Sequence, residues 1–385
     1  FLLLAFPIMR YTPLNDLTVF ILFITKIFFV IGTIVAILPL RLSGIGSAAK
    51  TLAPQNLSKL RNFLILSNIV GTLGVMLQWY HILQFFGGVD AFLNRIAQLY
   101  VIRIGEGLGM SNWVGYLASI GYAAVFLGGC YRGFDGKYKI FSVWPLFIVI
   151  LNGLAMMGRA SLIWGGLLFL NGFLLSRLVK RKHSALMTLG QVRMALRLGM
   201  VGIILFGLML GIRQMRAGGD NFRATAVNIR PYSNLSYADE SSFFWNAFLS
   251  NYVYATGSIP ALGRVVEDTR GLPQNWGTNT FGSIFRKLGF SVPRYLEFTG
   301  IPFSFNVYTA IADWYLDFGW LGIMLIPFIV GFLSSFLYEK ALGGKISIGS
   351  LATLGFLLLW LEFSTFISLS VQGFFLISLI LLWLG

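Results

Sequence analysis

The sequence predicts an all-α polytopic membrane protein with about nine or ten transmembrane helices and one large polar loop on the outer side. Hydrophobic residues fill 57% of the 385 positions and charged residues only 11%, a balance that a water-soluble core of this size does not need. Apolar stretches long enough to span a bilayer also recur along the chain. They cover residues 17–39, 62–86, 112–130, 138–157, 160–178 and 318–337.

Three further segments complete this prediction. Residues 194–212 form a weaker span, because Arg197 lies inside it near one end, where its side chain can extend to the membrane surface. Residues 349–385 are expected to form a closing helical hairpin, and the amphipathic stretch 91–109 to lie along the outer interface. The chain begins at Phe1 in what reads as the end of another apolar helix, so we expect a preceding segment.

The distribution of basic residues predicts the orientation. Segments 41–61, 132–139, 177–197 and 340–345 together carry 15 Lys or Arg, whereas the short loops of the opposite face carry four, namely Arg10, Arg95, Arg103 and Arg159. Basic loops stay in the cytoplasm, so the long segment 213–305 is expected outside, as a folded cap. We therefore divide the chain into an N-terminal transmembrane bundle (1–212), a periplasmic loop or cap (213–305) and C-terminal transmembrane helices (306–385).

Composition also narrows the chemistry. A single cysteine excludes an intramolecular disulfide, and two histidines are too few for an ordinary histidine-rich metal site. The chain carries 29 Lys and Arg against 14 acidic residues, which favours anionic lipid head groups or an anionic substrate. Nucleic acid is not expected as a partner, because the basic residues are scattered through short loops.

Arginines at the outer face are the first candidates for a binding site. Arg159 stands between two apolar stretches, where a guanidinium can hold a phosphate through two parallel hydrogen bonds or simply anchor among head groups. Several guanidinium groups in segment 213–305 would suit a diphosphate, although a solvated basic rim looks the same in sequence. The basic residues of this segment are Arg213, Arg216, Arg223, Arg230, Arg264, Arg270, Arg286, Lys287 and Arg294.

Acidic and aromatic residues supply the other candidates. On a helix, Asn306, Asp313 and Asp317 share one face, so either aspartate could act as a general base or pair with a loop arginine. Glu362 is expected to be a further buried acid. Aromatic residues such as Tyr254 could stack on sugar rings or belong to an interfacial aromatic belt.

Three short motifs, taken in order, resemble the O-antigen polymerase family, the Wzy-type oligosaccharide repeat-unit polymerases related to O-antigen ligases. They are GRAS at 158–161, YVYATGSIPAL at 252–262 followed by NTFG at 279–282, and NVYT at 306–309 followed by DFGWLG at 317–322. The resemblance covers roughly residues 159–322. It implies a GT-C-like fold in the bacterial inner membrane and a metal-independent glycosyltransferase without a cofactor, whose active site faces the periplasm.

The same resemblance implies the reaction and the partners. A glycan on undecaprenyl diphosphate would be transferred to an incoming lipid-linked repeat unit, with a chain-length regulator, a flippase and membrane lipids as partners. Arg159 matches the arginine that holds the lipid diphosphate in this family, and Arg264, Arg216 and Arg213 are candidates for a second contact. Substrate contacts are also expected from Asn306, Tyr254 and Tyr308.

The resemblance leaves the catalytic base open. The ligases carry a His-Asn pair where this chain has Phe305 and Asn306, so the base is Asp313, Asp317, a loop acid such as Glu240 or Glu267, or absent. If it is absent, arginine stabilisation of the departing diphosphate would carry most of the catalysis. A ligase-like transferase, a lipid-linked oligosaccharide flippase, a membrane acyltransferase and a scaffold protein remain the alternatives. The flippase is disfavoured because two related halves are not evident, and the acyltransferase because His81 has no neighbouring acid.

Overall fold

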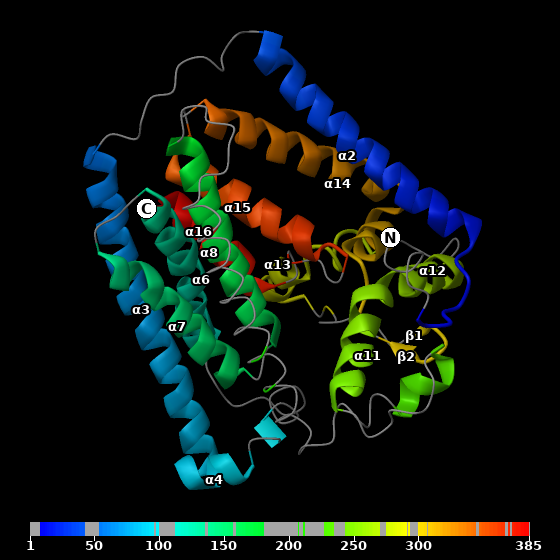
Figure 1. Ribbon diagram of the computed structural model, residues 1–385, viewed down its shortest axis with the longest axis horizontal. Coiled ribbons are helices and arrows are strands. Elements are labelled where there is room, and N and C mark those ends of the chain that lie inside the picture. The colour runs from blue at the N-terminus through cyan, green and yellow to red at the C-terminus, as the bar shows by residue number, and fades with distance from the viewer. Residues whose placement is uncertain are drawn as a thin grey trace. The chain divides into compact units, whose positions relative to one another are not determined.

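The computed structural model describes residues 8–42, 54–95, 98–99, 112–134, 138–156, 159–180, 207, 211, 227–234, 243–269, 275–290, 292, 299–305, 307–343, 346–365, 369 and 372–384. Within these residues, five helices are long and apolar enough to cross a membrane (Figure 1). They are α2 (Asp16–Leu42), α3 (Pro54–Phe86), α6 (Asn112–Gly133), α8 (Arg159–Lys180) and α14 (Ala310–Leu342). Three shorter apolar helices are α7 (Lys139–Ala155), α15 (Ile348–Phe363) and α16 (Gly373–Leu384).

These helices confirm the prediction of a helical chain with apolar, membrane-length helices, and every strong apolar stretch of the sequence falls on one of them. The expected closing hairpin corresponds to α15 and α16. The weaker span 194–212 lies, apart from two glycines, outside the described residues, as does most of the amphipathic stretch 91–109, which begins in the short α4 (Val89–Asn94). The total of nine or ten spans therefore stays a prediction.

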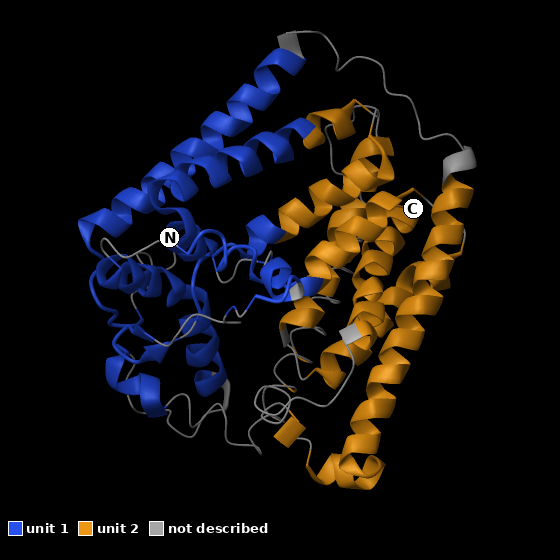
Figure 2. Cartoon of the chain, turned by 180° about the vertical axis from the view of Figure 1, so that it is seen from behind, with its two compact units in different colours: residues 1–42, 220–336, 360–373 blue, residues 43–219, 337–359, 374–385 orange. Residues whose placement is uncertain are grey.

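The chain forms two compact units (Figure 2). Unit 1 contains residues 1–42, 220–336 and 360–373, and unit 2 contains residues 43–219, 337–359 and 374–385. Each unit thus combines segments that are far apart in the sequence. The expected division at 212/213 and 305/306 concerns membrane topology, which these units do not address.

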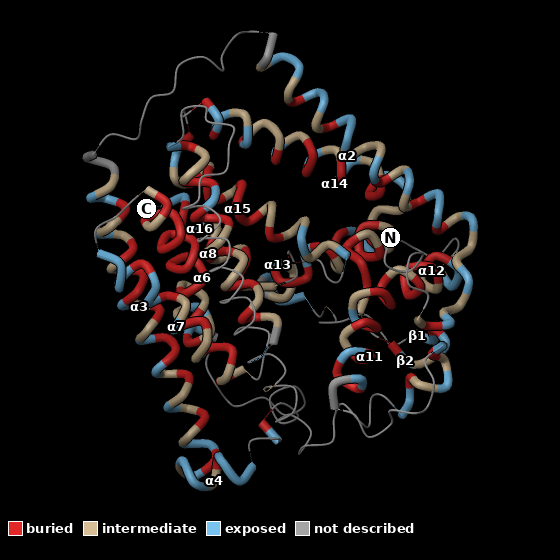
Figure 3. The backbone as a smooth tube through the Cα atoms, viewed as in Figure 1, coloured by how far each residue is buried: buried red, intermediate tan, exposed pale blue. Residues whose placement is uncertain are grey.

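Small residues hold the helices of unit 2 together around α6. Of the five membrane-length helices, α6 is the most enclosed, with 67% of its most apolar window buried, as the red stretches of its backbone show (Figure 3). A Cβ atom at Gly129 would lie 2.2 Å from the carbonyl oxygen of Phe169 in α8, and one at Gly74 in α3 would lie 2.4 Å from the backbone nitrogen of Ala118 in α6. Such close backbone approach is typical of helix packing in membranes, where lipid supplies no hydrophobic force between helices.

In unit 1, α2 runs beside α14 in the same manner (Figure 1). A Cβ atom at Gly32 would lie 2.1 Å from the carbonyl oxygen of Phe328, and one at Gly331 would lie 2.2 Å from that of Phe29. Only 22% of the most apolar window of α2 is buried. An apolar helix that exposes most of its surface is suited to contact with lipid.

The described parts of the polar segment 213–305 contain regular secondary structure. They contain the 3-10 turn η2 (Arg230–Tyr232), the helices α11 (Phe243–Thr256), α12 (Ser258–Asp268) and α13 (Gly282–Lys287), and a hairpin of β1 (Thr299–Gly300) with β2 (Ser304–Phe305). The hairpin is antiparallel, and Thr299 pairs with Phe305.

The polar segment shares one hydrophobic core with the apolar helices of unit 1. The buried core residues include Ile21 of α2, Leu249 of α11, Leu262 of α12 and Ala312 of α14. The N-terminal stretch joins the same core through Met9, which forms an antiparallel bridge with Ser233. Residues of the polar segment are thereby fixed against the first turns of α14.

Helix α14 begins eight residues before the predicted span and is broken inside. Thr309 caps its start, because its hydroxyl accepts a hydrogen bond from the backbone N–H of Ala312 (3.3 Å). Gly319 then adopts φ 57° and ψ −135°, a conformation that residues other than glycine essentially never adopt. The helix therefore consists of a short first half up to Phe318 and a long second half from Trp320.

We expect Gly319→Ala to destabilise the protein by about 1–3 kcal/mol, because a Cβ atom is not compatible with this backbone conformation. The measurement is the thermal unfolding midpoint of the purified protein in detergent. The matched control is Gly115→Ala in α6, where a Cβ atom would meet nothing within 4 Å. Equal midpoints for the two variants would show that Gly319 is not needed for the break.

Candidate functional site

The break in α14 is closed by the turn formed by residues 275–280. The last carbonyl groups of a helix have no intrahelical donors and need other partners. The carbonyl of Leu316 accepts a hydrogen bond from the backbone N–H of Asn275 (3.0 Å), and that of Asp317 accepts one from Trp276 (3.2 Å). The turn thus supplies N–H donors where the first half of α14 ends.

The side chain of Asp317 fixes the other end of the same turn. Its carboxylate is fully buried and accepts three hydrogen bonds, from the backbone N–H of Asn279 (3.0 Å), the side-chain amide of Asn279 (3.0 Å) and the backbone N–H of Thr280 (2.5 Å). Left-handed backbone at Trp276 (φ 48°) and Gly277 (φ 89°) reverses the chain between the two contacts. Asp317 therefore holds the polar segment onto α14, which is one of the structural roles that the sequence left open, although its donors are not an arginine.

Asp313 lies one helical turn before Asp317, on the same face of α14. It is 9% exposed, and no described residue donates a hydrogen bond to its carboxylate. A buried carboxylate without a donor is costly and is typical of sites that bind or react. Of the two predicted aspartates, Asp313 is the one whose oxygens are not used by the described fold.

Two tryptophans in this part of unit 1 have buried indole nitrogens. Trp314 follows Asp313 in α14, and its ring centroid lies 5.8 Å from that of Trp360 in α15, with the rings nearly perpendicular. The indole N–H groups of both are buried without an acceptor among the described residues. A hydrogen bond from the N–H of Ala310 to the carbonyl of Ser364 (2.7 Å) keeps the two helices together here. Unit 1 thus contains buried donors and a buried acceptor without described partners.

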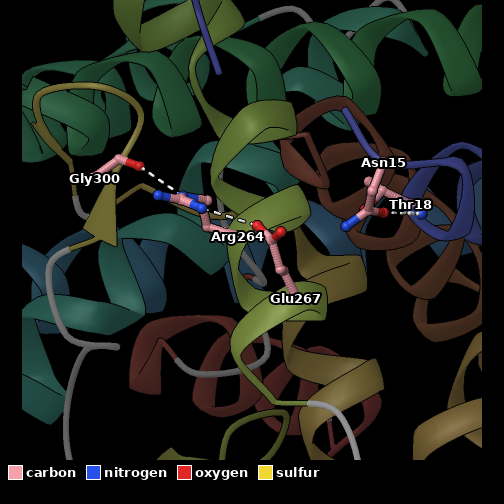
Figure 4. A network of polar contacts seen from close by, with 5 residues as sticks. All are labelled: Asn15, Thr18, Arg264, Glu267 and Gly300. Carbon is pink, nitrogen blue, oxygen red and sulfur yellow. Dashed lines mark hydrogen bonds and ion pairs between the residues drawn. The ribbon is translucent and has the colours of Figure 1, made fainter. Parts of the chain in front are cut away.

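Arg264 lies on α12, between Glu267 and the carbonyl of Gly300 (Figure 4). Its Nη1 forms an ion pair with Oε2 of Glu267 (2.9 Å), and its Nε donates to the carbonyl of Gly300 (3.1 Å). The two side chains are 39% and 48% exposed, so solvent screens the pair. No hydrogen bond or ion pair joins Arg264 to Asp313 or Asp317 among the described contacts. Glu267, a candidate base, is thereby occupied by Arg264.

The two predicted tyrosines differ in accessibility. Tyr254 on α11 is 37% exposed, and its ring lies 6.1 Å from that of Phe305. Tyr308 is 8% exposed and packs within the hydrophobic core of unit 1. Tyr254 therefore offers a ring face to a ligand in this structure, whereas Tyr308 contributes mainly to the core.

The remaining predicted site residues are only partly covered by the structure. Arg159 is the first residue of α8, at the end of an apolar helix as expected, but its side chain is outside the described residues. Arg213, Arg216, Asn306 and Glu240 also lie outside them. Glu362 was expected to be buried and is exposed instead, because it lies in the last turn of α15, beyond Leu359, the last buried residue of that helix.

Sequence reasoning gave no role to Gly319, Asn279, Thr280, Trp314 or Trp360. A signal existed for Gly319, since a glycine two residues after an aspartate, at the start of an apolar stretch, is compatible with a break in the helix. Asn279 and Thr280 belong to the NTFG motif, but nothing in the sequence links them to an aspartate nearly forty positions away. The tryptophans look like ordinary interfacial aromatics in sequence.

Comparison with known protein families, with characterised proteins and with solved structures returned no match.

We expect the two aspartates to respond differently to the same substitution. In Asp317→Asn, the new amide group would face N–H donors that need an acceptor, and the free energy of unfolding should fall by roughly 2–4 kcal/mol. Asp313→Asn breaks no described hydrogen bond and should unfold at or above the wild-type midpoint. Both are measured by thermal unfolding in detergent. A stable Asp317→Asn protein would contradict the anchoring role.

Proposed function

We propose that this chain is a membrane glycosyltransferase that polymerises oligosaccharide repeat units linked to a polyprenyl diphosphate, at the outer face of the bacterial inner membrane. The order of its three motifs around one large polar segment resembles that of the O-antigen polymerases. The structure itself shows a helical protein with membrane-length apolar helices.

The proposal rests on the burial of Asp313 without a described hydrogen-bond donor. Its carboxylate is buried at the start of a membrane-length helix and has no described donor, and Trp314 and Trp360 of the same unit carry indole N–H groups without acceptors. A hydroxyl group both donates and accepts hydrogen bonds, so a sugar supplies both kinds of missing partner. The exposed ring of Tyr254 adds a face on which a sugar could stack.

In the proposed reaction, Asp313 accepts the proton of an acceptor hydroxyl while the hydroxyl oxygen attacks the anomeric carbon of the donor glycan. The bond between that carbon and the diphosphate oxygen breaks, and its electron pair leaves with the lipid diphosphate. The negative charge that develops on the diphosphate requires cationic groups nearby. Arg159, Arg213, Arg216 and Arg264 are the candidates for this role.

The first test uses a strain that lacks this gene and carries Asp313→Asn. The surface polysaccharide ladder on a gel should shorten to a single repeat unit, because an amide cannot accept the proton. Asp268→Asn, an exposed aspartate of α12, is the matched control and should restore the full ladder. Protein abundance in the membrane is measured for both variants.

Two outcomes would contradict the proposal. Accumulation of lipid-linked polymer, with no repeat transferred, would indicate a ligase. A full ladder in both the Asp313→Asn strain and the strain without the gene would exclude polymerisation as the activity of this chain.

Substitutions of Arg159 test whether its guanidinium group binds the diphosphate. Arg159→Ala should abolish the ladder without lowering protein abundance, because the diphosphate loses a charged, two-pronged hydrogen-bond donor. Arg159→Lys should restore it only in part, since an ammonium group keeps the charge but not the paired geometry. Quantified band densities measure the effect. Full activity of Arg159→Ala would remove this residue from the site.

A further inference from the structure

The segment of residues 275–290, named here the interface segment, exposes an unusual number of apolar side chains. Single exposed apolar residues are ordinary on protein surfaces, but a cluster marks a contact surface. The five exposed side chains are Trp276 (75% exposed), Leu288 (68%), Phe290 (58%), Phe281 (39%) and Ile284 (39%).

The hydrogen bonds to α14 fix the depth of this segment relative to the membrane. The charged residues Glu339 and Lys340 mark one boundary of the membrane-spanning part of α14. A hydrocarbon core needs about 20 helical residues, which places the opposite boundary near Gly319 and Trp320. The interface segment is bonded to Leu316 and Asp317, just beyond that boundary. It therefore lies at the level of the lipid head groups.

The aromatic residues of α14 agree with this depth. Tyr315 and Trp320 lie on either side of the break, and their rings are 6.5 Å apart. The ring of Trp320 also lies 5.9 Å from that of Phe20 in α2. Tyrosine and tryptophan are enriched where a bilayer meets water, because their rings combine apolar and polar parts.

The charge of the interface segment matches a lipid surface. Its sequence contains Arg286 and Lys287 and no acidic residue. Anionic head groups attract such basic residues, while apolar neighbours enter the boundary between head groups and acyl chains. Basic residues beside exposed apolar side chains are typical of a segment at a lipid surface.

The backbone holds Trp276 in its exposed position. A left-handed conformation is rare for a bulky residue, and the turn bonded to Asp317 maintains it. The fold thus keeps a large indole outside the protein core at the depth of the membrane surface.

We propose that the interface segment is a membrane-docking element, which inserts Trp276, Leu288 and Phe290 into the bilayer interface at the Ala310 end of α14. The partner of this segment is the lipid surface itself. Because the segment is bonded to Asp317, its docking also fixes the depth of the first turns of α14, including Asp313. This inference concerns lipid contact and does not depend on any catalytic activity.

The test measures how a spin label on the segment collides with two relaxation reagents. Cys130 is the only cysteine of the chain and is buried, so a cysteine introduced at an exposed position can be labelled selectively. Leu288→Cys is labelled in the full chain and reconstituted in bilayer discs that contain anionic lipid. The matched control is Glu267→Cys on α12, whose side chain is 48% exposed in the same unit.

We expect oxygen, which concentrates in lipid, to collide with the label at residue 288 more often than a water-soluble nickel chelate does. The ratio of the two collision rates should exceed that at residue 267 by about threefold or more, as for an element buried several ångströms in the interface. Phe290→Cys, also exposed, repeats the measurement if Leu288→Cys does not accumulate in the membrane.

Two results would overturn the proposal. Equal ratios at residues 288 and 267 would mean that the segment faces water. Protection of residue 288 from both reagents would mean that protein covers it, either a second copy of the chain or a partner. The collision rates do not depend on catalytic turnover. These outcomes can therefore be distinguished from a failure of the proposed glycosyl transfer.

Discussion

The hydrogen bonds between Asp317 and the turn of residues 279–280 connect the polar segment of this protein to a membrane-length helix. They exist because Gly319 breaks α14 and leaves the carbonyls of Leu316 and Asp317 without helical donors. Carbonyl groups at the end of a helix lack helical donors and need other partners. The turn provides N–H groups for both carbonyls and for the carboxylate. The same hydrogen bonds therefore stabilise the break in α14 and attach the polar segment to this helix.

This arrangement gives different roles to two aspartates that look equivalent in sequence. Asp317 is fully buried, and donors from the turn compensate its carboxylate. Asp313 is nearly as buried, but no described donor compensates it, and the indole N–H groups of Trp314 and Trp360 also have no acceptor. Buried polar groups without partners are uncommon in folded proteins, which makes Asp313 a candidate for contact with a ligand.

The sequence predicted those features that depend on composition and local pattern. The apolar stretches predicted the membrane-length helices because lipid imposes their length and polarity, and helical periodicity placed Asp313 and Asp317 on one face. The sequence could not predict that α14 starts at Ala310, since the aspartates of the first turns interrupt the apolar pattern. Nor could it predict the partners of Asp317, because contacts with Asn279 and Thr280 depend on how distant segments meet. The exposed position of Glu362 was missed for the same reason.

The depth of Asp313 has a consequence for any lipid-linked substrate. About six residues separate it from the break at Gly319, which is roughly 9 Å along a helix. The head-group layer on each side of a hydrocarbon core is about 5–8 Å thick, so a membrane boundary at Gly319 would put Asp313 near the outer edge of that layer. A polyprenyl diphosphate keeps its chain in the hydrocarbon and its phosphates among the head groups, which puts its first sugar at this level. In the proposed reaction a general base would be needed there, and a segment that docks in the interface beside Asp317 would hold Asp313 at that depth.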